Sequence, residues 1–170
     1  MIYKLFWSLP TAIIFLLVYN CVVNLLLRMD RGSYIKQNIF VIYIAFVLTI
    51  TLDLDRIWVS IWYRWPLPDV ALFSGNINFS LFSNIGSLRG KVMLLENIVL
   101  FLPFGLLLHT LIKKEKCLET VLIALLVSGA IGCIQFTIGR AFDIDDLAMN
   151  TLGALIGWIL WKQYQQIVNK

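Results

Sequence analysis

Long apolar runs alternate with short polar segments along most of the chain. Runs of about 17–25 apolar residues allow one helix to cross the hydrocarbon core of a membrane. Unbroken runs also favour helices over the alternating strands of a barrel. The pattern predicts an all-α fold, a polytopic membrane helix bundle with about five transmembrane helices. We expect these helices at residues 8–27, 35–52, 92–112, 118–138 and 145–161.

The stretch 53–91, between the second and third predicted spans, has a different pattern. Ile57, Ile61 and Trp65 recur at helical spacing among several aromatic residues, and Pro66 follows them. Aromatic rings prefer the membrane–water interface. The stretch therefore predicts an amphipathic interfacial segment, and we expect it to anchor the chain rather than to bind a ligand.

The composition agrees with a membrane protein. Of the 170 residues, 60% are hydrophobic and only 14% are charged, and the mean hydropathy is +0.84. Soluble domains carry about 25% charged residues. The length suits a single domain over residues 1–170. The net charge of +4 does not indicate a nucleic-acid partner, because the basic residues lie at the ends of apolar runs. Membrane lipid is the partner that we expect.

Loop charges predict the orientation, because Lys and Arg are enriched in cytoplasmic loops. The basic segments 28–36 and 113–116 and the C-terminal tail are expected inside, whereas the loop after residue 138 holds one arginine against three aspartates. We predict a multi-pass protein of the bacterial inner membrane, with its N-terminus outside and its C-terminus in the cytoplasm. The apolar stretch 5–27 exceeds a signal-peptide core of about 7–15 residues, so we expect a retained helix.

Few residues suit nucleophilic or cofactor chemistry. His109 is the only histidine, and it lies far along its span from the aspartates, so we interpret it as an interfacial side chain. Cys21, Cys117 and Cys133 have neither disulfide nor metal-ligand spacing. The sequence contains no glycine-rich phosphate loop. We therefore predict no catalytic residue, no metal ligand set and no cofactor.

Polar residues lie at similar depths near the outer ends of three predicted spans. Glu96 and Asn97 begin the span 92–112, Gln135 lies late in the next span, and Asn150 lies early in the last. Isolated polar groups are costly in lipid, so we expect these four side chains to face one another or a wet cavity. An acid at mid-membrane costs roughly 2.5–3.5 kcal/mol on insertion scales, which predicts that Glu96 is paired or protonated.

The stretch GRAFDIDDLAMNTLGALIGW places a charged cluster where the last helix begins. One interpretation is structural: Asp143 or Asp145 caps the helix, where acids suit the positive dipole, and Arg140 neutralises the cluster. The second interpretation is a polar binding site at the outer face. Three acids could also hold a hard cation such as Mg²⁺ or Ca²⁺, although the spacing does not require one. The candidate binding residues are Glu96, Asn97, Gln135, Arg140, Asp143, Asp145, Asp146 and Asn150.

Small residues continue the polar face of the last helix. Gly153 and Gly157 form a small-xxx-small pair, which permits close packing of helices. The preceding span carries a second stripe of small and polar residues. We expect the two stripes to pack together. The second stripe consists of Ser128, Gly132, Gln135 and Gly139.

The segments ENIVLFLPFGLLL and GRAFDIDDLAMNTLGALIGW, with a glutamine in the helix between them, resemble the VanZ-like membrane proteins. That family carries an N-x-x-x-F-x-P-x-G helix and an R-x-x-D-x-x-D-x-x-x-N-x-x-G signature. The resemblance covers about residues 78–161, and the last block is its specific part. The matching residues are Asn97, Phe101, Pro103 and Gly105, then Arg140, Asp143, Asp146, Asn150 and Gly153.

Two positions depart from the family pattern. The family often has Glu where this chain has Gly132. It also often shows an N-x-x-P-F pattern in the outer stretch, which residues Asn78 to Phe82 match except that Leu81 replaces the proline. Our hypothesis is that Glu96 supplies the missing acid from the preceding span. Gly132 would then leave space for that side chain, with Gln135 and Asn150 as its hydrogen-bond partners. The alternative is that Glu96 merely reaches out to the interface.

The resemblance implies a role in the cell envelope without naming a ligand. The family is named for a protein associated with teicoplanin resistance, by a mechanism that is not understood. We expect the protein to bind or alter an envelope component, such as a lipid-linked one, at the outer face, so that glycopeptide susceptibility changes. Two alternatives stay open: a membrane enzyme acting on a lipid-linked phosphate or sugar, and a structural or assembly protein without a ligand.

Overall fold

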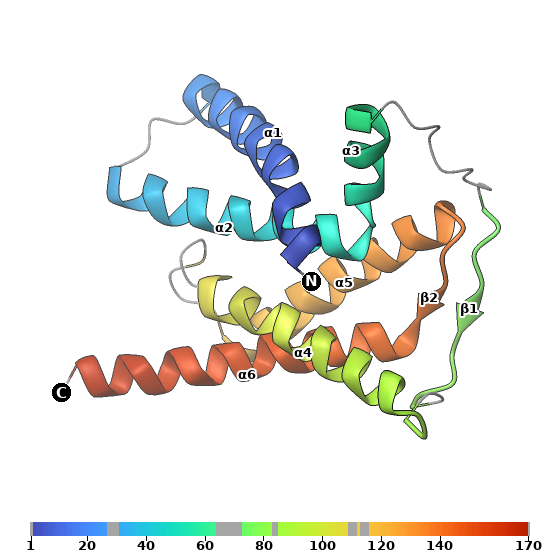
Figure 1. Ribbon diagram of the computed structural model, residues 1–170. Helices are drawn as coiled ribbons and strands as arrows, with labels where there is room; N and C mark the ends of the chain where they lie inside the picture. The colour runs from blue at the N-terminus through green and yellow to red at the C-terminus, as the bar shows by residue number, and fades with distance from the viewer. Residues whose placement is uncertain are drawn as a thin grey trace. The chain divides into compact units, whose positions relative to one another are not determined.

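The computed structural model describes residues 2–26, 31–63, 73–82, 85–108, 112 and 116–169. Within these residues the chain forms six helices and two very short strands, and it divides into two compact units, Met1–Val70 and Ala71–Lys170 (Figure 1). The predicted all-α fold is confirmed. The strand pair was not predicted.

The first unit is a helical hairpin with a shorter third helix. Within its apolar interfaces, Trp58 Nε1 donates a hydrogen bond to Thr11 Oγ1 at 2.8 Å, and the Tyr19 hydroxyl donates one to Gln37 Oε1. These bonds tie the first helix to the third and to the second, because buried polar groups need partners. The helices are α1 (Ile2–Leu26), α2 (Arg31–Thr51) and α3 (Leu54–Tyr63).

The third helix confirms the helical part of the segment that we expected at an interface. Asp53, at the turn from α2, adopts φ 50°, in the left-handed region that Asp tolerates better than most residues. The exposed side chains of α3 include Ile61, Trp62 and Tyr63, as an amphipathic helix requires. Trp65 and the prolines after it lie outside the described residues.

The second unit contains three long helices and the strand pair. Both α4 and α5 pack against α6, and Figure 1 shows α6 running across α4. The strands pair in parallel, with Ile77 opposite Phe142 and Asn78 opposite Asp143. The elements are β1 (Ile77–Asn78), α4 (Leu88–Leu108), α5 (Cys117–Thr137), β2 (Phe142–Asp143) and α6 (Ile144–Val168).

The backbones of α4 and α6 approach each other closely at glycines. A Cβ atom added to Gly153 would lie 2.3 Å from the carbonyl oxygen of Ile98, and one added to Gly157 would lie 2.1 Å from that of Leu102. From the other side, a Cβ at Gly105 would lie 1.9 Å from the carbonyl oxygen of Ala154. Each helix therefore needs the other's glycines.

This interface corrects our prediction that Gly153 and Gly157 pack against α5. They pack against α4, because Gly105 gives that helix a matching small surface. The α5 stripe is filled differently: a Cβ at Gly132 would lie 2.7 Å from the ring of Phe142. The two stripes meet only in part, where Asn150 Nδ2 donates to Ser128 Oγ at 2.9 Å.

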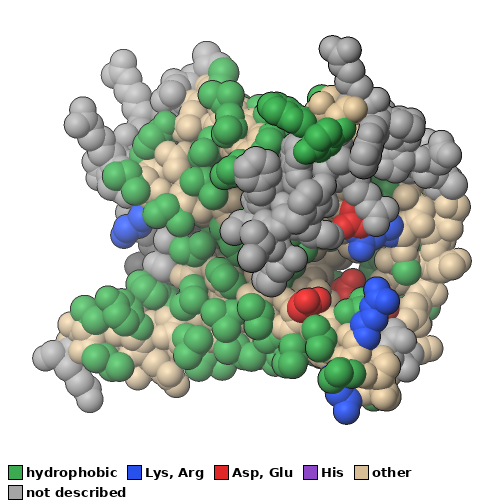
Figure 2. All heavy atoms as spheres, in the orientation of Figure 1, with side chains coloured by type: hydrophobic (Ala, Val, Ile, Leu, Met, Phe, Trp, Pro, Cys, Tyr) green, Lys and Arg blue, Asp and Glu red, His purple; other side chains and the backbone are tan. Residues whose placement is uncertain are grey.

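Three described helical segments are long and apolar enough to cross a membrane: Tyr34–Thr51, Leu88–Leu108 and Cys117–Thr137. A helix of 21 residues is roughly 32 Å long at 1.5 Å per residue, which matches the hydrocarbon core. Large hydrophobic side chains cover the outer faces of the second unit's helices. Figure 2 likewise shows hydrophobic side chains over much of one face.

The other two predicted spans are helices with different apolar lengths. In α1 the apolar segment among the described residues is Ser8–Val22. The last helix, α6, is 25 residues long and extends seven residues beyond the predicted end at Trp161. The first helix begins at Ile2, six residues before the predicted start at Ser8, and the remaining boundaries agree with the predicted ranges to within four residues.

Candidate functional site

An extended segment, residues 73–82, lies against the junction of α5 and α6, and we call it the strap. At its start, the Phe73 amide donates to the carbonyl of Thr137 at 3.0 Å, and further on the Phe142 amide donates to that of Asn76 at 2.8 Å. A Cβ at Gly75 would lie 2.2 Å from the carbonyl oxygen of Arg140. Only glycine fits this approach, so the strap follows one defined path.

Asp143 joins the strap to the start of α6. Its Oδ1 accepts the backbone N–H of Asp145 at 3.0 Å, which caps the helix, and its Oδ2 accepts Asn78 Nδ2 at 3.2 Å. The capping role that we considered for Asp143 is thus confirmed. Both carboxylate oxygens are engaged, so this acid holds local structure together.

Asp145 also contacts the strap. Its carboxylate is 4% exposed, and its Oδ1 accepts the backbone N–H of Phe82 at 2.7 Å. Phe82 adopts φ 58°, a left-handed conformation that is strained for an aromatic residue. A buried carboxylate is stable only with hydrogen bonds, and here that bond fixes the far end of the strap.

Asp146 faces α4 instead of the strap. Its Oδ1 accepts a hydrogen bond from Asn97 Nδ2 at 2.5 Å, which links α4 to α6. The side chain is partly buried. The charge of Arg140 attracts this carboxylate, while the charges of Asp143 and Asp145 repel it. Asp146 is therefore the acid of the cluster that connects two helices, α4 and α6.

Arg140 is held by its backbone. Its N–H donates to the carbonyl of Gln135 at 2.8 Å, and the preceding Gly139 adopts φ 79°, which lets the chain reverse after α5. The side chain is partly buried.

The deeper amides, Gln135 and Asn150, are both buried. Asn150 lies one helical turn below Asp146 on the same face of α6. Its Nδ2 reaches Ser128, but its Oδ1 has no hydrogen-bond partner among the described residues. The structure therefore places these residues inside the helix packing rather than on a lipid-facing surface.

Glu96 does not join the cluster in the way that we expected. Its side chain is exposed, and the space beside Gly132 is occupied by the Phe142 ring. The hypothesis that Gly132 makes room for the Glu96 carboxylate is therefore wrong. A glutamate next to Asn97 points away when Asn97 faces α6, because consecutive helical residues project about 100° apart.

The cation alternative gains no support from the geometry. In the described part of the chain, no three His, Cys, Asp or Glu side chains are grouped so that they could hold a metal ion. Asp143 and Asp145 turn their oxygens toward backbone and amide donors instead. His109 lies outside the described residues.

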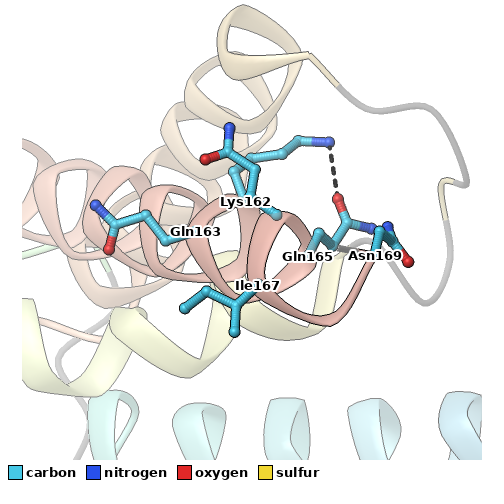
Figure 3. Close-up of a pocket in the computed structure, with 6 residues that line it drawn as sticks. Lys162, Gln163, Gln165, Ile167 and Asn169 are labelled. Atoms are coloured by element: carbon cyan, nitrogen blue, oxygen red, sulfur yellow. Dashed lines mark hydrogen bonds between the residues drawn. The ribbon is translucent and has the colours of Figure 1, made fainter.

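A pocket of about 730 Å³ lies far from the acids, along the last turns of α6. Figure 3 shows Lys162 Nζ donating to Gln165 Oε1 there, at 3.4 Å. Lys162 Nζ also lies 5.7 Å from the centroid of the Trp158 ring. About 24 Å of helix separates Lys162 from Asp146, at 1.5 Å per residue, so this pocket is distinct from the candidate site.

Sequence reasoning missed the strap as a partner of the acids. Asn78 and Phe82 belong to the outer stretch of the family pattern, and that resemblance was the signal that could have found them. Hydrophobic periodicity could not have found them, because it reports local structure only. The strap pairs with residues that lie about 60 positions later in the sequence.

The chain is similar in sequence to known proteins. Protein VanZ of Enterococcus faecium is 34% identical over 87 residues, which are 51% of this chain and 52% of that protein. The chain thus matches about half the length of this curated relative. No solved structure matches the chain. A family model described as VanZ/LLP1 matches residues 11–168. With nearly its whole length matched, the chain belongs to the VanZ/LLP1 family.

Proposed function

We propose that this protein is a multi-pass protein of the bacterial inner membrane that binds or alters an envelope component at the outer face. Its action changes susceptibility to teicoplanin-like glycopeptides. The observation that carries the proposal is the hydrogen bond from Asn97 to Asp146, which holds a partly exposed carboxylate between α4 and α6. Ionisable residues in membrane-spanning helices are rare and commonly mark functional sites.

The orientation follows from charge and helix length. Two helices of this unit, α4 and α5, are long enough to span, and they meet α6 at the acids. The lysines of the segment 113–116 lie at the other ends of α4 and α5, where positive charge favours the cytoplasm. The polar cluster then opens to the outer side, where glycopeptides and their targets are found.

The two interpretations of the acids apply to different residues. Asp143 and Asp145 hold the strap, as a structural role requires. Asp146 bonds a side chain of another helix and is partly exposed, as is Arg140. A binding role therefore rests on Asp146 and Arg140.

Expression of the protein in a glycopeptide-susceptible host tests the proposal. We expect the wild-type chain to raise the minimal inhibitory concentration of teicoplanin and Asp146→Asn to return it to the level of the empty vector. The asparagine keeps the shape of the side chain and an oxygen for Asn97, but it removes the charge.

A matched control is Glu119→Gln, at the start of α5. Glu119 Oε2 accepts the backbone N–H of Lys116, and Gln serves equally in such a capping box. Both variants must reach the membrane in wild-type amounts by immunoblot. The proposal would be contradicted if the Asp146→Asn strain showed the same rise in the minimal inhibitory concentration of teicoplanin as the wild-type strain.

A further inference from the structure

The far half of the strap carries large apolar side chains that protein does not cover. Phe79 is 71% exposed and Leu81 is 52% exposed, and Phe82 is exposed as well. Apolar side chains gathered on an exposed surface commonly mark contact with a membrane or with another protein. This surface therefore needs an occupant.

The exposed face of α4 carries the same chemistry. Its apolar residues Leu88, Val92, Leu95 and Val99 are exposed at steps of three and four residues, so they form one stripe along the helix. Ile85, which lies between the strap and α4 in the chain, is also exposed. Because α4 is long and apolar enough to cross a membrane, this stripe faces lipid wherever the helix spans the bilayer.

Two hydrogen bonds show how far along α4 the strap reaches. Asn97 of α4 bonds Asp146, and the adjacent Asp145 accepts the Phe82 amide. Phe82 therefore lies near the level of Asn97, which comes nine residues after the first residue of α4, Leu88. Nine residues are about 14 Å of helix at 1.5 Å per residue. The far end of the strap thus lies beside the third turn of α4 and not beyond the helix end.

The backbone of the strap is hydrogen-bonded to protein acceptors. The Ser80 amide donates to Asn78 Oδ1 at 3.1 Å, and the Ile85 amide donates to the carbonyl of Phe82 at 3.1 Å. The Phe82 amide donates at 2.7 Å to the carboxylate of Asp145, which is buried. Irregular backbone is tolerated at membrane depth only where protein satisfies its polar groups, and these bonds meet that condition.

We propose that residues 79–82 and 85–88 insert into the outer leaflet of the bilayer, so that the strap is a re-entrant segment that enters and leaves on the same side. Phe79, Leu81 and Phe82 contact acyl chains and continue the lipid-facing stripe of α4. This inference rests on the proposed function, because it requires α4 and α5 to span a membrane with the acids toward the outer side.

Charges beside the stripe favour lipid over a protein partner. Arg89, Lys91 and Glu96 are exposed, and all three lie within about 12 Å of the first residue of α4, measured along the helix. Long charged side chains near a helix end can extend to the headgroups while their stems stay in apolar surroundings. A protein that covered the stripe would also bury these charges and would have to pair each of them.

Site-directed spin labelling in vesicles measures the depth of the strap. Phe79→Cys and Leu81→Cys, in a full chain without the native cysteines, each carry one nitroxide in vesicles of phosphatidylethanolamine and phosphatidylglycerol. Molecular oxygen concentrates in the bilayer, whereas nickel ethylenediaminediacetate stays in water. We expect the ratio of the two collision rates, oxygen to nickel, to lie close to that of a label at Val99. It should be severalfold above that of a label at Asn169, which is exposed at the end of α6.

Three results would overturn the proposal. The first is a ratio at positions 79 and 81 as low as that at Asn169, which would place the strap in water. The second is slow collision with both reagents, which would show that protein covers these side chains. The third is spectral broadening by a nearby nitroxide, which would show that a second copy of the chain occupies the surface.

A variant of the buried acid tests the role of the backbone bonds. In the chain labelled at position 81, Asp145→Ala leaves the Phe82 amide without its acceptor. The strap must then reach toward water, so we expect the collision ratio to fall severalfold. Glu119→Gln, at the other end of α5, should leave the ratio unchanged. A ratio that is the same with and without the Asp145 carboxylate would contradict the proposal.

The label at Val99 separates this inference from the proposed function. Lipid contact at Val99 together with water contact at positions 79 and 81 refutes the inserted strap alone. Water contact at Val99 would show that α4 does not span, and the proposed function would fail with it. An inserted strap in a protein without any effect on teicoplanin susceptibility supports this inference and refutes the proposed function alone.

Discussion

Asn97 of α4 donates its side-chain N–H to the carboxylate of Asp146 on α6 at 2.5 Å, and one residue further along α4 the carbonyl of Ile98 faces Gly153. The two α4 residues are neighbours, but on α6 Asp146 and Gly153 lie seven residues apart, which is about 10 Å at 1.5 Å per residue. The polar bond therefore lies about two turns nearer the start of α6 than the close backbone contact at Gly153.

The bond from Asn97 to Asp146 should contribute measurably to stability. Asn97→Ala leaves a partly buried carboxylate without its donor, so we expect the free energy of unfolding in detergent to fall by roughly 1–3 kcal/mol. Val99→Ala, on the exposed face of the same helix, should change it by less than about 0.5 kcal/mol. Equal losses in the two variants would show that the bond is unimportant.

The glycine contacts predict a graded response to a single methyl group. Gly157→Ala places a Cβ 2.1 Å from the carbonyl oxygen of Leu102, so α4 and α6 must separate, at a cost of about 1–3 kcal/mol. Gly129→Ala on α5 meets only a Leu147 methyl at 4.0 Å. That change should be neutral or stabilise the chain by up to about 1 kcal/mol, since alanine favours helix.

Thermal unfolding of both alanine variants in the same detergent measures this difference. Gly153→Leu should be more destabilising than Gly157→Ala, because a Cβ at Gly153 would already lie 2.3 Å from the carbonyl oxygen of Ile98 and leucine adds further carbons beyond it. If Gly129→Ala and Gly157→Ala unfold at the same temperature, the close approach of α4 and α6 does not exist.

Asp145 should control the far end of the strap. Asp145→Ala removes the acceptor for the Phe82 amide, so we expect faster hydrogen exchange at Phe82 and faster proteolysis within residues 73–82. Asp146→Asn should leave both rates unchanged, because its partner is Asn97 on α4. Mass-spectrometric exchange on the purified protein measures each. Acceleration in both variants alike would mean that the acids act as one unit.

Much of this fold could be predicted from the sequence, for physical reasons. The bounds of α4 and α5 follow from apolar runs whose length the membrane fixes, and the cap at Asp143 follows from an acid directly before an apolar helix. The partner of Gly153 and Gly157 does not follow, because a stripe of small residues does not say which of two helices it meets. Only Gly105, on α4, decides it.

The sequence predicted which residues make up the candidate site, but it did not predict which partner each of them binds. Spacing placed Asp143, Asp145 and Asp146 together, but their partners are Asn78, Phe82 and Asn97, which lie 49 to 65 residues away. Local patterns carry no information about such partners. The strap's path depends on Gly75 passing the carbonyl of Arg140, which is a tertiary contact.

The topology predicts which loops react from outside. In a background without the native cysteines, a cysteine at Ser74 should react with a membrane-impermeant maleimide added to whole cells, whereas one at Lys114 should react only after the cells are opened. The reason is the concentration of lysines at 113–116. Labelling of position 114 in intact cells would reverse the orientation and remove the outer-face proposal with it.

The departure from the family pattern at Gly132 makes a last prediction. The ring of Phe142 fills the position above Gly132, 2.7 Å from where a Cβ would lie. Gly132→Glu must therefore displace that ring, and we expect a loss of roughly 1–3 kcal/mol in the free energy of unfolding. Phe142→Ala should also destabilise the chain, because it leaves a cavity.

The double variant, Gly132→Glu with Phe142→Ala, tests whether a glutamate at position 132 can fill the space left by the Phe142 ring. Its carboxylate would occupy the space of the lost ring, within reach of the polar groups of α6. We expect it to be more stable than the sum of the single losses predicts, by about 0.5–3 kcal/mol, the range seen for residues in contact. Additive losses would show that Phe142 does not take the place of the family's glutamate.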